Sequence, residues 1–255
     1  MARRILLNLL LLVLCLTATG QSRNSLRDPG FVSRIVGTPT GGGGGGTTWL
    51  LEENWDSTTE DTGWTYTGTY DNDYTTTVLE GSQSIWLDGA ATEATVLKSF
   101  TADSEVWAYF MYWKNENPGA NVDIFAIRDS GGNNLLRLQL RTSGAIRIFQ
   151  GTTGDSTTTT VGTIANSTLT HIWVHYKADP AGGAAEGVAE IWMDVDGDGS
   201  ATKPASSGNY YEIAPAGDAT ADAEQFYGRG TVSSSHQSIF DKCRVDDVEI
   251  GSDPT

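Results

Sequence analysis

The chain of 255 residues carries twice as many acidic as basic side chains, 32 against 16, and a formal net charge of −16. Beyond position 40 the imbalance grows to 31 acidic against 11 basic residues. This charge repels nucleic-acid phosphates and anionic lipid, so it excludes nucleic-acid binding and favours neutral sugars or calcium as partners.

The first twenty residues have the three parts of a secretory signal peptide. Arg3 and Arg4 form a basic start, residues 5–16 an apolar core, and Ala18-Thr19-Gly20 a small-residue cleavage site. The apolar core is shorter than the roughly 20 residues that span a bilayer. We expect a signal peptide at 1–20 and a mature protein that is secreted or held at the cell surface without a membrane span.

Cleavage would remove Cys15 and leave Cys243 as the remaining cysteine, so no intramolecular disulfide could form. An exported chain of this kind favours a bacterial or phage source. Residues 21–48 are polar and end in the six glycines Gly41–Gly46, which predicts a flexible N-terminal linker. The folded domain is expected over residues 49–255.

Within the domain, short runs rich in Val, Ile, Trp, Tyr and Thr alternate with clusters of Gly, Asn, Asp and Ser, as in all-β proteins. Residues 136–141 alternate leucine with arginine or glutamine, and the glycines of 128–134 and 141–145 mark hairpin turns. The thirteen predicted strands are 49–55, 64–70, 82–88, 94–100, 105–113, 122–129, 135–141, 145–151, 159–165, 171–178, 187–195, 210–215 and 239–250. So many strands require a two-sheet antiparallel β-sandwich, or jelly roll.

The order of these motifs resembles the concanavalin A-like lectin/glucanase superfamily, particularly laminin-G-like jelly rolls of bacterial and phage surface proteins. The motifs are LLEENWD, LEGSQSIWLD, EVWAYFMYW, LLRLQLRTSGAIRIFQ, HIWVHYKA, GVAEIWMDVDG and FDKCRVDDVEI. The resemblance implies glycan binding, or the scaffold of a glycan-cleaving enzyme.

The catalytic patterns of such enzymes are incomplete here. In residues 190–196, Trp192 stands where the glucanase pattern has its middle aspartate, and the final glutamate is absent. Lyase-type sandwiches carry a Gln-x-His triplet that this chain lacks, although His171 and His175 share a strand face. We expect no catalysis, with a divergent hydrolase or lyase as the alternative.

The stretch DVDGDGS places Asp194, Asp196 and Asp198 at the spacing of a calcium loop, with Gly199 at the bend. The twelfth position is Ala205 instead of a bidentate glutamate. The sequence leaves open a partial calcium site or a solvated turn.

The resemblance implies a second calcium site where the first and last strands pair, with Glu52, Glu53 or Asn54 from the first strand and Asp246 or Asp247 from the last as ligands.

The strand at 106–113 is apolar or aromatic on both faces. One face holds Trp107, Tyr109, Met111 and Trp113, and the sequence leaves open which face is buried. An open aromatic face would stack sugar rings, and burial beneath loops is the alternative. The predicted carbohydrate-binding residues are Trp107, Tyr109, Trp113, Trp173, His175 and Trp192.

The sequence therefore predicts a secreted, non-catalytic, lectin-like module that binds a glycan, and it leaves open whether calcium stabilises the module. The alternative is a structural or adhesive filament subunit that self-associates through its N-terminal segment.

Overall fold

The computed structural model describes residues 49–56, 63–88, 93–150, 160–179, 187–194, 210–213, 222–230, 236–247 and 249–250. These residues all belong to the compact unit Gly43–Thr255. The predicted signal peptide and linker lie outside them, as do Asp196 and Asp198. Within the described ranges every regular element is a strand. These residues therefore contain no long apolar helix of the kind that crosses a membrane.

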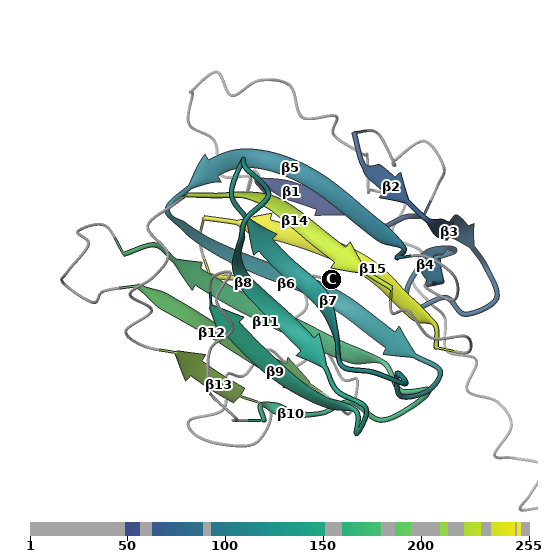
Figure 1. Ribbon diagram of the computed structural model, residues 1–255. Helices are drawn as coiled ribbons and strands as arrows, with labels where there is room; N and C mark the ends of the chain where they lie inside the picture. Colours follow the sequence, from purple (N-terminus) through teal and green to yellow (C-terminus); the bar gives the residue numbers. More distant parts are fainter. Residues whose placement is uncertain are drawn as a thin grey trace, which may run out of the picture. The chain divides into compact units, whose positions relative to one another are not determined.

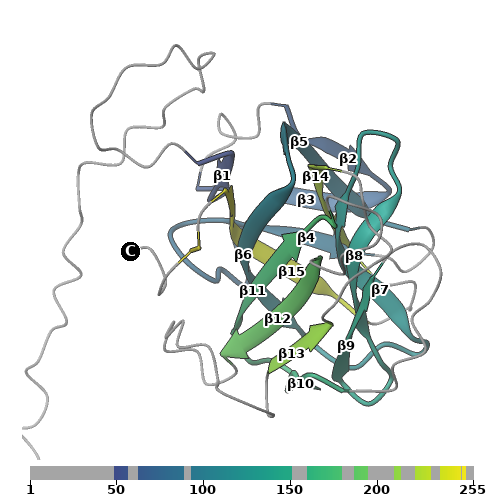
Figure 2. The ribbon, with the colours of Figure 1, turned by 90° about the vertical axis from the view of Figure 1, so that its left-hand side faces the viewer.

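The described residues form fifteen strands in two antiparallel sheets, which Figures 1 and 2 show as separate layers. The eight-stranded sheet contains β1 (Leu51–Glu53), β3 (Thr69–Tyr74), β4 (Ser84–Asp88), β6 (Glu105–Lys114), β11 (Thr170–Lys177), β12 (Val188–Asp194), β13 (Tyr210–Ile213) and β15 (Ser238–Asp246). The seven-stranded sheet contains β2 (Thr65–Thr67), β5 (Thr95–Asp103), β7 (Val122–Arg128), β8 (Asn134–Leu140), β9 (Ala145–Gln150), β10 (Gly162–Thr163) and β14 (Ala223–Arg229). The predicted β-sandwich is confirmed.

The strand order places β6, β11, β12 and β15 next to one another. The eight-stranded sheet runs β13-β12-β11-β6-β15-β4-β3, with β1 paired to β15, and the other runs β10-β9-β8-β7-β14-β5-β2. The pairing of β1 with β15 joins the first and last strands, as the resemblance implied. The predicted hairpin turns join β7 to β8 and β8 to β9, with Gly132 and Gly144 at φ of 79° and 83°.

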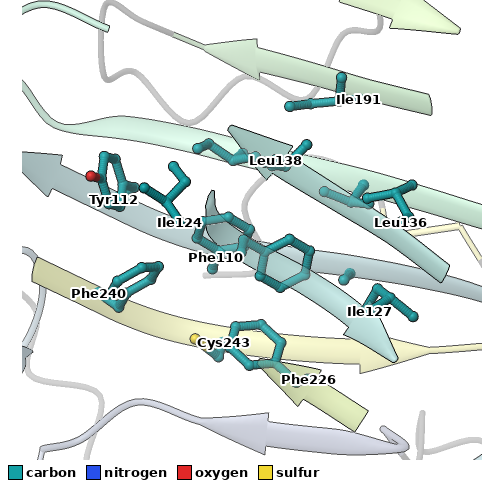
Figure 3. Close-up of a cluster of buried hydrophobic side chains, with 14 of the residues drawn as sticks. Phe110, Tyr112, Ile124, Ile127, Leu136, Leu138, Ile191, Phe226, Phe240 and Cys243 are labelled. Carbon is teal, nitrogen blue, oxygen red and sulfur yellow. The ribbon is translucent and has the colours of Figure 1, made fainter. Parts of the chain in front are cut away.

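The core lies between the sheets and is centred on four phenylalanine rings, of which Figure 3 labels Phe110, Phe226 and Phe240. Phe110 of β6 packs against Phe125 of β7 at 4.6 Å between ring centroids, and against Phe226 of β14 at 6.0 Å. Phe240 of β15 lies 5.8 Å from Phe110, and all four side chains are fully buried. Because strand side chains alternate, burial of this face of β6 turns Trp107, Tyr109, Met111 and Trp113 to its outer face.

A buried carboxylate on β15 fixes the segment between β3 and β4. Asp241 accepts hydrogen bonds from the Ser84 hydroxyl at 2.8 Å and from the backbone N–H of Glu80 at 3.1 Å. It also accepts one from the N–H of Lys242, whose φ of 49° marks the bulge in β15. Burial raises the pKa of Asp241 to about 8, although these hydrogen bonds favour its charged form.

This raised pKa predicts a loss of stability with pH. The folded protein binds the Asp241 proton more tightly than the unfolded chain, so the stabilisation is complete at low pH and is lost as pH rises through about 8. Asp241→Asn keeps a neutral side chain of the same shape. Urea unfolding at pH 5 and pH 9 should show the wild type losing more stability than the variant over this interval. Parallel losses in the two proteins would contradict a pKa of Asp241 that lies within this interval.

Candidate functional site

The register across β6, β11 and β12 places the predicted sugar-binding residues in rows on the outer face of the eight-stranded sheet. His175 lies opposite both Trp107 and Glu190, which forms the first row. The second row consists of Trp173 between Tyr109 and Trp192. A third row places His171 between Met111 and Asp194.

The first row is a stacked and hydrogen-bonded cluster. The Trp107 indole lies parallel to the His175 imidazole, with centroids 3.7 Å apart and an interplanar angle of 5°. His175 Nε2 is 3.0 Å from Glu105 Oε1, and its Nδ1 is 3.6 Å from Glu190 Oε2. Lys177 Nζ is 3.0 Å from Glu105 Oε2. These contacts fix the plane of the indole.

Trp107 remains partly exposed although the histidine and glutamate of its row are buried. The side chains of Glu105 and Lys177 beside it are 36 % and 40 % exposed. Partial burial opposes the charge of Glu105, but hydrogen bonds from Lys177 and His175 hold the pKa of its carboxyl below the usual value. The end of the face at Trp107 therefore offers an aromatic surface flanked by charged hydrogen-bonding groups.

The second row is covered instead of open. Tyr109, Trp173 and Trp192 are at most 2 % exposed. They form a cluster with Met111 and Ile250, and Trp49, Leu79 and Leu169 pack against that cluster. Trp113 lies further along β6, opposite Ile239, and is partly exposed. Of the predicted carbohydrate-binding residues, Trp107 and Trp113 are therefore the partly exposed ones.

A buried tyrosine–histidine pair spans the second and third rows. The Tyr109 hydroxyl lies 2.7 Å from His171 Nδ1. Such a pair could exchange a proton with a substrate, but Tyr109 is fully buried and His171 is 3 % exposed. The pair lies on the same sheet face as Trp107, in the two adjoining rows, and is not presented to a ligand in this structure.

The predicted metal ligands are dispersed. Glu52 Oε1 is 3.1 Å from Arg244 Nη2, so the Glu52 carboxylate is paired with a guanidinium in this structure. Asp246 lies opposite Trp107 and is buried. Asp194 ends β12, and its two predicted partners lie outside the described residues. Among the residues described, no group of three or more His, Cys, Asp or Glu could hold a metal.

Comparison with known proteins shows the fold. No family model matches the sequence, and no curated protein matches it. The structure is similar to the cellulose-induced protein Cip1, with a TM-score of 0.56, 14 % identity and coverage of 79 % of this chain and 99 % of that one. It is also similar to the potassium-bound carbohydrate recognition domain of Emp46p, with a TM-score of 0.53, 10 % identity and coverage of 80 % and 100 %.

A third similar structure is the PL-14 alginate lyase from Aplysia kurodai, with a TM-score of 0.51, 11 % identity and coverage of 78 % and 99 %. At such identities the likeness shows the fold alone. The chain has the concanavalin A-like jelly-roll fold, which occurs both in sugar-recognition domains and in sugar-cleaving enzymes.

Proposed function

We propose that this protein is a secreted carbohydrate-binding module that holds a neutral glycan against Trp107. The observation that carries the proposal is the partly exposed indole, stacked at 3.7 Å on His175 and flanked by Glu105 and Lys177. Sugar rings pack their C–H faces on aromatic rings, and their hydroxyls bind nearby polar groups. A pre-ordered indole reduces the conformational entropy that binding would otherwise cost.

The charge of the site favours a neutral ligand. Glu105 and Glu190 flank His175, and Glu105 also forms an ion pair with Lys177. The basic side chains of this site are therefore already in contact with carboxylates. The carbohydrate recognition domain of Emp46p supports sugar binding on this fold, and the signal-like residues 1–20 support an extracellular location.

The test is affinity electrophoresis of the full chain through gels containing laminarin, xylan or hydroxyethyl cellulose. We expect at least one neutral polysaccharide to retard the protein, and the matching free oligosaccharide to restore its mobility. Equal mobility in every gel would contradict the proposal. Release of unsaturated or reducing sugar ends that disappears in His171→Ala would instead indicate a lyase or hydrolase.

We also propose that calcium stabilises the loop that begins at Asp194, because this residue supplies a hard oxygen ligand at the end of β12. Thermal unfolding should be compared in calcium and in chelator, for the wild type and for Asp196→Ala. At a calcium concentration of 100 Kd the ion would add about 2.7 kcal/mol, and the substitution should remove that gain. A gain that survives the substitution would place the ion elsewhere, and no gain would identify a solvated turn.

A further inference from the structure

A line of arginines crosses the outer face of the seven-stranded sheet, on the side of the sandwich opposite the Trp107 site. Arg128 ends β7 and lies opposite Asn134 of β8. Arg137 of β8 lies opposite Phe149 of β9, and Arg147 of β9 lies opposite Gln139 of β8. With a rise of 3.3 Å per residue and about 4.8 Å between strands, the line from Arg128 to Arg147 spans about 20 Å.

Two of these guanidinium groups lie over aromatic rings. The guanidinium carbon of Arg128 is 3.3 Å from the centroid of Tyr227, and that of Arg137 is 4.5 Å from the centroid of Phe149. The two rings are only 8 % and 7 % exposed. Stacking of this kind fixes the plane of a guanidinium while leaving its N–H groups able to bind carboxylates in a bidentate manner.

Only one arginine of this line forms an ion pair with a described carboxylate. Arg137 Nη1 is 2.8 Å from Asp123 Oδ2, but Arg128 donates to a neutral acceptor, Asn134 Oδ1, at 2.9 Å. Arg147 is half-buried, and its Nε is buried without a hydrogen-bond partner. In a chain with twice as many acidic as basic residues, two arginines on one face without an ion pair to any described carboxylate are unexpected for a solvated surface.

We propose that this face binds an acidic polysaccharide whose sugar carboxylates pair with Arg128 and Arg147. The 20 Å line exceeds the size of a single small anion and fits an extended chain with repeated charges. A second copy of this protein is a poorer occupant, because Glu105 and Glu190 on its opposite sheet face are ion-paired or buried. The surface is separate from the Trp107 site, so either proposal can fail without the other.

The test is the affinity of the full chain for polygalacturonate, measured by biolayer interferometry at two salt concentrations. Arg147→Gln should weaken binding at least about fivefold, and Arg128→Gln by a similar factor. Lys98→Gln is the matched control, because it removes one positive charge near Trp64 instead of from this face, and it should bind as the wild type does. Arg147 forms no ion pair with the described residues and its Nε lacks a hydrogen-bond partner, so its replacement should change thermal unfolding little.

The Trp107→Ala variant distinguishes the two proposed sites. It should no longer bind the neutral glycan but should bind polygalacturonate as the wild type does. Absence of wild-type binding at low salt would overturn the proposal, as would arginine variants that bind as tightly as the wild type. Equal affinity for inorganic polyphosphate would overturn the assignment to a sugar acid. Self-association in sedimentation that disappears in Arg147→Gln would identify a second copy as the occupant and would also overturn it.

Discussion

Replacement of Trp107 by alanine is expected to reduce affinity for the neutral glycan about 30-fold, which corresponds to about 2 kcal/mol. The loss arises because the indole supplies the apolar contact and His175 holds it in a fixed plane at 3.7 Å. Isothermal titration calorimetry with the oligosaccharide that displaces the protein in affinity electrophoresis measures the change.

The matched control for this substitution is Trp86→Ala. Trp86 is also a partly buried tryptophan on the eight-stranded sheet, and it stacks on Tyr74 at 5.8 Å. Its replacement should leave glycan affinity unchanged. A loss of affinity in Trp86→Ala with none in Trp107→Ala would move the site to the β3–β4 end of the sheet.

Replacement of Phe110 by alanine is expected to lower the free energy of unfolding by 3–5 kcal/mol, about the range for buried phenylalanine. Phe110 contacts both sheets, because Phe125 and Phe226 come from the seven-stranded sheet and Phe240 from its own. Removal of the ring therefore leaves a cavity between the two sheets, and the surrounding backbone can move only slightly to fill it. Urea denaturation followed by tryptophan fluorescence measures the loss.

Tyr70→Ala is the surface control for the core substitution. Tyr70 is 41 % exposed and stacks on Tyr66, so its truncation should cost less than about 1 kcal/mol. Similar losses for the two variants would mean that the four-phenylalanine cluster is not the centre of the core.

Two-residue periodicity was enough to predict most of the sandwich. The alternation of Leu136, Leu138 and Leu140 with polar residues identified one buried face, and the structure places all three leucines in the core. Strand β14 was missed, because its residues Ala223–Arg229 contain a glycine and three polar side chains and show no clear alternation. Its burial is determined by pairing with β5 and β7, which local sequence does not encode.

The candidate site was only partly predictable for the same reason. Strand periodicity correctly grouped Trp107, Tyr109 and Trp173 on one face, since register follows from alternation. Which of them stay exposed depends on Ile250 and Trp49, which come from the two ends of the domain and pack against that face. The ion pair between Glu52 and Arg244 likewise depends on contact between the first and last strands, which local sequence does not encode, and the calcium site expected there stays a prediction.

The most direct test of a glycan site at Trp107 is an NMR titration of the full-length, ¹⁵N-labelled protein with a neutral oligosaccharide. The eight indole N–H signals can be assigned by single Trp→Phe substitutions. We predict that the Trp107 indole and the backbone amides of Glu105 and Lys177 shift most, with saturation at one ligand per chain. Shifts that avoid these three residues and gather elsewhere, or no shifts with any neutral glycan, would contradict the proposed function.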